Sequence, residues 1–283
     1  MSKYINYSYL DEDTKKEIRR AIIKAISIPG YIVPFASREM PISRGWGTGG
    51  LQITLTIIKE EDILKVIDQG SDDSVNAVIL REFISSCSFC KTTKDTTKAS
   101  IIQTRHRIPE TPTTEEQILV FQVPYPDVLV TVEPDSYIQK KLHAFHDYSK
   151  LWILLFDDIF AVGDSRFTHR YPVRVNDGYV MDPSPIPRFD IPKLNNNKSL
   201  LLFGAGREKK IYAIPPYTKV EPLKFEDIEF KIELYEEIRC EKCGAKGVFF
   251  DIFEDSCGEK HYYCNDTDFC ERNRYAYRSK RSK

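Results

Sequence analysis

Four cysteines near the C-terminal end constrain the fold of this chain more than any other feature. They are spaced C-x2-C-x20-C-x5-C, at Cys240, Cys243, Cys264 and Cys270. A C-x2-C pair on a tight turn directs two thiolates to one ion, and a second pair about twenty residues later can complete a tetrahedral or cluster site. The spacing therefore predicts a small cysteine-rich metal-binding lobe at residues 236–283.

Two kinds of occupant suit this cysteine pattern. A single structural zinc ion is the usual one. The last gap differs from a symmetric zinc ribbon, because five residues separate Cys264 from Cys270 where a second C-x2-C would place two. That asymmetry suggests an iron–sulfur cluster on Cys240, Cys243 and Cys264, with Cys270 left for chemistry.

Charge and cysteine usage exclude several classes of protein. The 41 basic and 42 acidic residues leave no global field that points to nucleic acid or to an anionic membrane. The seven cysteines are an odd number, and Cys87 and Cys90 lie in a helical pattern, which argues against a secreted disulfide framework. We expect a cytoplasmic protein with no nucleic-acid partner and no membrane span.

Hydrophobic periodicity predicts an α+β fold, with a mixed sheet and flanking helices. The expected helices span residues 14–28, 60–68, 73–87 and 135–160, the last as one helix or a helical hairpin, and the expected strands span 51–57, 100–105 and 118–123. A β-hairpin is expected at 173–181, with Asp177-Gly178 in its turn.

These elements suggest three units. Residues 1–125 and 171–235 would form a catalytic scaffold, interrupted by a helical insertion at 126–170 and followed by the cysteine-rich lobe at 236–283. An apolar stripe from Ile138 to Ile159 in the insertion predicts a docking surface for a partner.

Three further segments could carry chemistry. Gly30 begins a glycine-rich loop at 29–50, and its unshielded α-carbon could hold a radical, although a simple turn after a helix is the alternative. Arg105, His106 and Arg107 would alternate along a strand and could contact phosphate or metal, unless they form a solvated strand edge. An anion nest or an ordinary turn could form at 204–207, where Gly204, Gly206 and Arg207 lie.

Four long runs carry a resemblance to a known family. They are PGYIVPFASREMPISRGWGTGG at 29–50, IIQTRHRIPETP at 101–112, YVMDPSPIP at 179–187 and LFGAGREKKIYA at 202–213. In this order they resemble the catalytic subunits of bacterial phosphonate carbon–phosphorus lyases, and the resemblance spans nearly the whole chain. The gap between Cys243 and Cys264 is slightly shorter than in that family, and Cys257 inside it is an alternative ligand.

The resemblance implies radical chemistry, although the C-x3-C-x2-C motif of radical S-adenosylmethionine enzymes is absent. Cys240, Cys243 and Cys264 would hold a [4Fe–4S] cluster that binds S-adenosylmethionine. The resulting 5′-deoxyadenosyl radical would take hydrogen from Gly30, and the glycyl radical would pass to Cys270. A thiyl there would attack the phosphorus of α-D-ribose 1-methylphosphonate 5-phosphate and expel a methyl radical, which takes hydrogen from the protein to give methane. Closure by the sugar 2-hydroxyl would then break the bond to Cys270 and release α-D-ribose 1,2-cyclic phosphate 5-phosphate.

The resemblance also implies partner proteins. The chain would join the other subunits of a carbon–phosphorus lyase core complex, with His106 facing a subunit that shares a second metal. An ABC-type ATPase would dock on the insertion at 126–170. Zinc would replace the cluster in preparations exposed to air. The competing interpretation is a zinc-ribbon structural or scaffold subunit of a multiprotein complex, without catalysis of its own.

Overall fold

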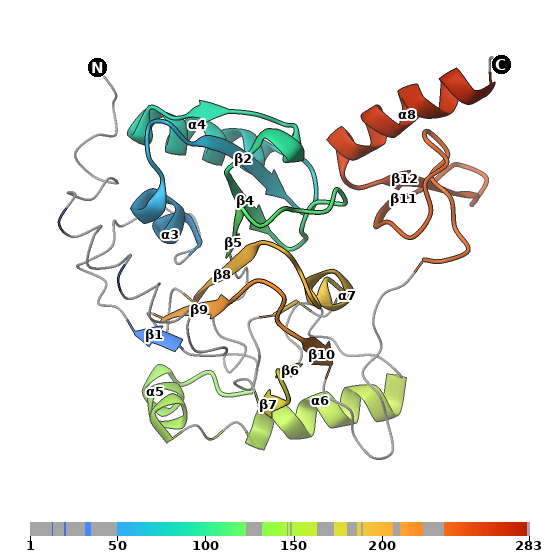
Figure 1. Ribbon diagram of the computed structural model, residues 1–283. Coiled ribbons are helices and arrows are strands. Elements are labelled where there is room, and N and C mark those ends of the chain that lie inside the picture. Colours follow the sequence, from blue (N-terminus) through green and yellow to red (C-terminus); the bar gives the residue numbers. More distant parts are fainter. Residues whose placement is uncertain are drawn as a thin grey trace.

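A seven-stranded mixed sheet forms the centre of the fold (Figure 1). A computed structural model describes residues 13, 20, 32–34, 50–122, 132–145, 147, 149–162, 173–179, 186–187, 189–205, 210–222 and 235–281. The strands are, in spatial order, β1 (Ile32–Pro34), β9 (Lys210–Ile214), β8 (Leu200–Ala205), β5 (Ile118–Gln122), β4 (Ile101–Arg105), β2 (Ile63–Asp68) and β3 (Lys91–Thr92). Strands β8, β5, β4, β2 and β3 run parallel, and β9 and β1 pair antiparallel at one edge. The expected α+β architecture with a mixed sheet is confirmed.

Both faces of the sheet are covered by apolar layers. Helices α3 (Gly50–Ile57) and α4 (Val75–Ser88) pack on one face, where they bury the side chains of Leu64 and Val120. The other face carries Leu119 and Phe121 and is covered by α7 (Ile191–Leu194) and by the small sheet of β10 (Val220–Pro222), β6 (Val173–Val175) and β7 (Gly178–Tyr179). Successive residues of β5 therefore point to opposite cores, as strand geometry requires.

The segment 51–57 is helix α3, so the expected half-buried strand is wrong. Every residue from Leu51 to Thr56 is buried, and a helix that is buried on all sides shows no amphipathic stripe. Its polar side chains have internal partners: Thr56 Oγ1 donates to the Gln52 carbonyl at 2.7 Å, and Thr54 donates to Gln103 of β4. The alternation of polar and apolar residues thus reflects buried hydrogen bonds and not a solvent-facing side.

The expected helix at 60–68 is also wrong, because residues 63–68 form strand β2. Two of its charged residues, Lys65 and Asp68, are buried. Lys65 Nζ contacts Asp72 at 2.8 Å, and Asp68 is paired with Arg105 at 2.7 Å. Partners from outside strand β2 allow these charged side chains to lie inside the sheet.

Other expected elements are confirmed. The helix expected at 73–87 is α4; Ser74 caps it by accepting a hydrogen bond from the Ala77 amide, and it ends at Phe89, whose φ is 60°. Strands β4 and β5 lie where they were expected. The hairpin at 173–179 is present, but its turn is formed by Asn176 and Asp177, with φ of 48° and 62°, while Gly178 already pairs with Val175. Within the expected helix at 14–28, the described residue Arg20 is helical.

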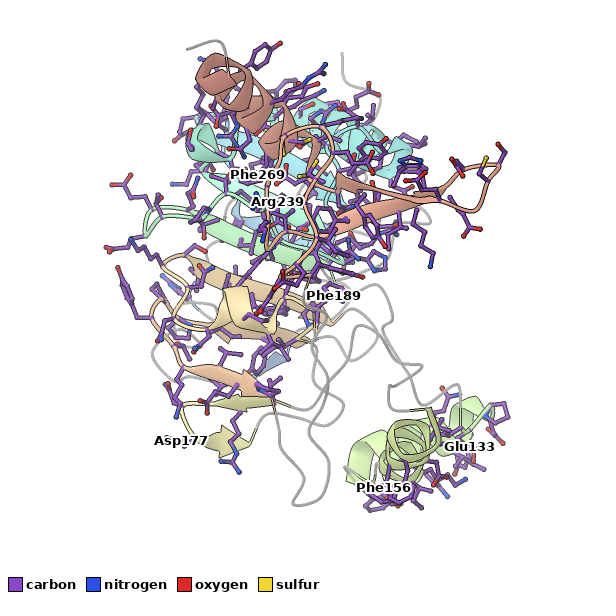
Figure 2. All side chains as sticks on the ribbon, turned by 90° about the vertical axis from the view of Figure 1, so that its right-hand side faces the viewer. Glu133, Phe156, Asp177, Phe189, Arg239 and Phe269 are labelled. Atoms are coloured by element: carbon purple, nitrogen blue, oxygen red, sulfur yellow. The ribbon has the colours of Figure 1, made fainter. Side chains whose placement is uncertain are left out.

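The described part of the segment expected as an insertion contains two helices, α5 (Ser136–Phe145) and α6 (Ser149–Val162), which Figure 2 shows apart from the sheet. Several of their apolar side chains are exposed, among them Phe145 at 79 % and Phe160 at 71 %. No helix in the part of the chain that the structure describes is long and apolar enough to cross a membrane.

Candidate metal centre and the pocket beside it

Four thiols meet inside the C-terminal lobe, which is built from β11 (Phe250–Glu254), β12 (Lys260–Cys264) and α8 (Thr267–Arg281). Cys240 and Cys243 lie in a tight turn that is closed by a hydrogen bond from Gly244 N to Cys240 O at 2.7 Å. Cys264 ends β12, and Cys270 lies in the first turn of α8. Three separate segments therefore contribute ligands to one point.

The spacing of the sulfurs is that of a single tetrahedral ion. The distance from Cys240 Sγ to Cys270 Sγ is 3.7 Å, and that from Cys243 Sγ to Cys264 Sγ is 3.5 Å. All four sulfurs lie within 4.8 Å of one another, and each cysteine is at most 6 % exposed. A tetrahedral zinc site with Zn–S bonds of about 2.3 Å places its sulfurs about 3.8 Å apart. The four thiols therefore suit one tetrahedral zinc ion.

A [4Fe–4S] cluster suits the donors but not their spacing. Soft thiolates are the normal ligands of iron–sulfur clusters. Four irons and four sulfides between the ligands, however, require the thiolate sulfurs to stand farther apart than around one shared ion. Cys270 also lies with the other three sulfurs and not to one side of them, so the group as described does not fit three cluster ligands and a separate fourth thiol.

The five-residue gap before Cys270 has a local explanation. Asn265 and Asp266 link β12 to α8, and Asp266 begins the helix by accepting a hydrogen bond from the Phe269 amide on its side chain at 2.9 Å. The Cys270 amide then bonds the Asp266 carbonyl at 3.0 Å. One turn of helix is needed before a side chain returns to the centre, so the longer gap reflects the change from strand to helix.

The environments of the thiols separate their pKa values. Hydrogen bonds from Cys264 and the neighbouring thiols lower the pKa of Cys270 to about 6, whereas desolvation raises the pKa of Cys243 to about 11. The Cys264 amide also donates to Cys240 Sγ at 3.3 Å. The group thus favours one thiolate when it holds only protons, and a divalent ion would displace the protons that remain.

The other cysteines lie elsewhere. Cys257 is exposed in the turn between β11 and β12 and is not part of the thiol group, so of the two alternatives, Cys257 and Cys270, the structure brings Cys270 to the centre. Cys87, in α4, and Cys90, just after it, are buried in the core.

Hydrogen bonds from the loop after β4 hold the lobe against the sheet. The Glu110 amide donates to Asp266 Oδ2 at 2.9 Å, and the Glu110 carboxylate accepts the Phe249 amide at 2.9 Å and Lys193 Nζ at 2.6 Å. Gly70, in the turn after β2, lies against Asn265 so closely that a Cβ atom there would lie 1.7 Å from Asn265 Oδ1. The lobe therefore rests on the edge of the sheet where β2 and β4 end.

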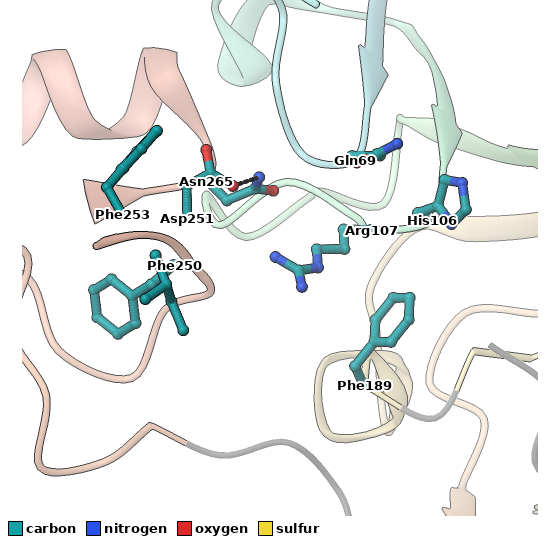
Figure 3. A pocket seen from close by; sticks show the side chains of 9 residues that line it. Gln69, His106, Arg107, Phe189, Phe250, Asp251, Phe253 and Asn265 are labelled. Atoms are coloured by element: carbon teal, nitrogen blue, oxygen red, sulfur yellow. Dashed lines mark hydrogen bonds between the residues drawn. The ribbon is translucent and has the colours of Figure 1, made fainter. Parts of the chain in front are cut away.

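A pocket of about 580 Å³ opens between this edge and the lobe (Figure 3). Its polar and aromatic lining comes from both sides: Gln69, His106, Arg107 and Phe189 from the sheet side, and Phe250, Asp251, Ile252, Phe253 and Asn265 from the lobe. It lies at the carboxyl ends of parallel strands, which is where open α/β sheets commonly bind ligands.

His106 and Arg107 are the two predicted site residues that line this pocket. Strand β4 ends at Arg105, and His106 has a φ of 72°, so the expected alternation along a strand is wrong for both residues. Burial and the nearby Arg105 lower the pKa of His106 to about 4, so its imidazole is neutral at pH 7. The Arg107 guanidinium lies 4.7 Å from the centre of the Phe249 ring.

The remaining predicted residues are placed differently. Arg105 is engaged by Asp68 through two contacts of 2.7 Å and does not line the pocket. Gly204 is buried inside β8, where it pairs with Gln122 and Ile211. Outside the described residues lie three predicted positions, Gly30, Gly206 and Arg207.

Sequence reasoning missed the other polar groups of the pocket. Asn265 Nδ2 donates to Asp251 Oδ1 at 2.7 Å, which Figure 3 marks, and Gln69 lies across from them with a φ of 53°. Only weak signals pointed to these residues: Asn265 directly follows a ligand cysteine, and Gln69 precedes Gly70, a turn residue. Their convergence depends on how the lobe docks.

Comparison with known proteins gives consistent matches. Residues 3–276 match the family described as "Phosphonate metabolism protein PhnJ". The chain is 51 % identical over 268 residues to the "Alpha-D-ribose 1-methylphosphonate 5-phosphate C-P lyase" of Escherichia coli (strain K12), which covers 94 % of this chain and 95 % of that protein. It is 52 % identical over 270 residues to the protein of the corresponding name from Rhizobium meliloti (strain 1021), covering 95 % and 91 %.

Proposed function

The chain belongs to the PhnJ family of phosphonate metabolism proteins, and on this premise we propose that it cleaves the carbon–phosphorus bond of α-D-ribose 1-methylphosphonate 5-phosphate. The products would be methane and α-D-ribose 1,2-cyclic phosphate 5-phosphate, formed in the cytoplasm. The observation that carries the proposal is 51 % identity, over nearly the full length of both chains, to a lyase named for this substrate. The buried thiol centre, in the same lobe that lines a pocket with Arg107, is consistent with it.

For the cofactors, we propose a [4Fe–4S] cluster on Cys240, Cys243 and Cys264, together with S-adenosylmethionine. When bound, this pair would supply a one-electron reduction that generates a carbon-centred radical. The described sulfur spacing suits zinc, so a cluster requires the thiols to move apart. Because Cys243 Sγ and Cys264 Sγ lie 3.5 Å apart, the turn of Cys240 and Cys243 would have to move away from the end of β12. Cys270, which lies on α8, would leave the group separately.

Gly30 and Cys270 are the residues that we propose to carry the radical. Cys270 is only 6 % exposed, with its sulfur 3.7 Å from that of Cys240, so it must leave the thiol group before it can meet a substrate. Such movement would loosen the contacts that Asp266 makes with the Glu110 amide. Catalysis by Cys270 therefore requires the lobe to open.

The pocket offers groups that suit one anionic end and the sugar of the proposed substrate. Arg107 supplies a cation that can form charge-assisted hydrogen bonds to a phosphonate or phosphate group. Asp251 and Gln69 offer polar groups that suit sugar hydroxyls. Arg105, held by Asp68, would position the loop that carries Arg107 rather than touch the substrate.

Two further substrate and metal roles are proposed. A neutral His106 presents a nitrogen lone pair, which supports a second metal ion shared with histidines of another subunit of the core complex. Gly204, Gly206 and Arg207 remain candidates for the 5-phosphate.

One observation favours a second function, that of a structural zinc subunit without catalysis. The sulfur distances of 3.5 and 3.7 Å match a closed tetrathiolate zinc site, in which no coordination position stays open for a cofactor. In that case the lobe would stabilise a scaffold, and another subunit would carry out the reaction.

Anaerobic reconstitution with iron and sulfide separates the two functions. The lyase should develop charge-transfer absorbance, cleave S-adenosylmethionine after reduction and release methane. Cys240→Ser should abolish all three, Cys270→Ala should keep the absorbance while releasing no methane, and Cys257→Ser, the matched control outside the centre, should behave as the unaltered protein. A colourless protein that retains one zinc ion under these conditions would instead establish the structural function.

We also propose that the exposed helices α5 and α6 bind an ABC-type ATPase. Phe145 and Phe160 lie largely in solvent, and exposed aromatic groups of this kind commonly mark interfaces. Changing both residues to aspartate should release the ATPase in a pulldown. Tyr275→Asp, at a 76 % exposed aromatic residue on α8, is the matched control and should not. Unchanged ATPase binding by a soluble double variant would exclude the insertion as the docking site.

A further inference from the structure

The hairpin of β11 and β12 carries a second group of metal-ligating side chains, separate from the cysteines. Phe253 pairs with His261 and Glu254 pairs with Lys260 across the hairpin. Because side chains alternate between the faces of a strand, Asp255, Glu259 and His261 share one face of the hairpin, and Glu254 and Lys260 lie on the other. The ligand atoms of the first three residues lie within 4.8 Å of one another.

The imidazole of His261 is held in the orientation of a metal ligand. Its Nδ1 lies 3.1 Å from the carboxylate of Glu241, a residue of the cysteine turn and not of the hairpin. Its Nε2 faces Asp255 Oδ2 at 3.7 Å. That separation is too long for a hydrogen bond, but it is close to the distance of about 3.4 Å between nitrogen and oxygen ligands of a tetrahedral zinc ion. A carboxylate behind the imidazole is the usual outer partner of a histidine ligand.

Asp255 is fixed by the backbone in a complementary way. Its Oδ1 accepts the amides of Cys257 at 2.8 Å and Glu259 at 2.9 Å. These bonds satisfy one carboxylate oxygen and direct the other, Oδ2, toward His261. The turn thus orients a carboxylate oxygen before any ion arrives, and preorganised ligands favour binding.

Protonation of His261 at Nε2 competes with metal binding at this group. Hydrogen bonding to Glu241, with the nearby charge of Asp255, raises the pKa of His261. The same negative surroundings attract a divalent cation, which competes with the proton for Nε2.

We propose that Asp255, Glu259 and His261 form a second metal site, for Zn²⁺, at the tip of this hairpin. Three protein ligands leave a fourth position open to water or to a donor from another molecule. Glu241 acts as the positioning residue, and through it the hairpin site is joined to the turn of Cys240. The assignment does not depend on the lyase reaction.

Zinc titration of the full chain tests the proposal. The cysteine centre is first loaded with one zinc ion, and further Zn²⁺ is then titrated at pH 7.5 in competition with a chromophoric chelator. A second ion should bind. His261→Ala and Glu259→Gln should each weaken the second ion at least about tenfold, Glu241→Gln should weaken it about 10- to 100-fold, and all three should keep the first.

Two controls on the same hairpin make the result specific. Glu254→Gln removes the same charge as Glu259→Gln but from the opposite face, and it should leave the affinity unchanged. Cys257→Ser should also have no effect, because its sulfur is not among the grouped ligand atoms. A chain that binds a single zinc, equal losses in the Glu254 and Glu259 variants, or loss of the second ion in Cys257→Ser would each overturn the assignment. If His261→Ala also weakens zinc binding at the cysteine centre, Glu259→Gln serves as the test of the second site.

Discussion

Gly70→Ala should lower the stability of the folded chain through one contact, that between Gly70 and Asn265 at the edge of the pocket. Gly70 has a φ of 89°, in the left-handed region, and a Cβ atom at this position would lie 1.7 Å from Oδ1 and 2.8 Å from Cγ of Asn265. Neither distance is tolerable, so the Asn265 side chain must turn away. When it turns, it loses its hydrogen bond to Asp251.

The expected magnitude has two parts. An alanine in the left-handed region costs about 1 to 2 kcal/mol. A lost hydrogen bond to a partly exposed carboxylate costs about 1 kcal/mol. Gly70→Ala should therefore lower the free energy of unfolding by about 2 to 3 kcal/mol.

Two variants separate these parts in urea unfolding of the zinc-loaded chain. Gly247 has a φ of 65°, and a Cβ atom added to it would meet nothing within 4 Å, so Gly247→Ala should show the backbone cost alone. In an Asn265→Ala background the clash disappears, because the Asn265 Cβ would lie 3.6 Å away, in ordinary contact. There Gly70→Ala should cost no more than Gly247→Ala.

Two results would refute this reasoning. One is a Gly70→Ala variant no less stable than Gly247→Ala. The other is a double variant whose loss equals the sum of the two single losses, which would mean that Asn265 plays no part in the cost. Faster hydrogen exchange at the Phe249 amide, which bonds Glu110 across the same boundary, would locate the damage at the docking of the lobe.

Three further changes test other parts of the structure. Burial raises the pKa of Asp190 to about 7, so between about pH 4 and 7 the folded chain holds a proton that the unfolded chain lacks, and this contribution to stability is lost as the pH rises through that range. Asp190→Asn keeps an acceptor for the Ile108 amide. In urea unfolding from pH 5 to 8, the stability of this variant relative to the unaltered chain should therefore increase as the pH rises. Arg107→Met should raise KM for the phosphonate about 10- to 100-fold in the assembled complex, the loss expected for one charged hydrogen bond, and an unchanged KM would exclude Arg107 from substrate binding. Lys65→Met should cost about 3 to 5 kcal/mol in urea unfolding, because it leaves Asp72 buried without its cation, and replacing Asp72 by leucine as well should recover much of the loss.

The metal centre could be predicted from the sequence because ligand spacing is local. Cys240 and Cys243 share one turn, and the later pair needs only a strand and the first turn of a helix to return to them. The role of Cys270 was less predictable. Its longer gap suggested a separate thiol, whereas the start of a helix at Asp266 explains the same gap with all four sulfurs together.

The errors in the sheet have a common physical cause. Periodicity assumes that polar side chains face water, yet Thr54, Lys65 and Asp68 are buried and find partners outside their own elements. A pattern read within one segment cannot include Asp72 or Arg105 as those partners. The sequence pattern consequently predicted a strand where helix α3 lies and a helix where strand β2 lies.

The pocket was only half predictable for a related reason. His106 and Arg107 stood out in a basic run, but Asp251 and Asn265 reach the pocket from the other side of the docked lobe. Their position follows from Glu110, a residue of the loop after β4 that bonds the lobe through both its amide and its carboxylate and belongs to no recognisable motif.

The order of segments along the chain has a consequence for biogenesis. Gly70, Glu110 and Thr111, the residues that receive the lobe, all precede it, and Arg272 of α8 reaches back to the Thr111 hydroxyl at 2.8 Å. Chains begin to fold from their N-terminal end during synthesis, so the receiving surface is complete before the ribosome reaches Cys240. Metal is therefore inserted late, after the sheet that receives the lobe has folded. A cell starved of metal should accumulate chains with a folded sheet and a C-terminal lobe that proteases can still cleave.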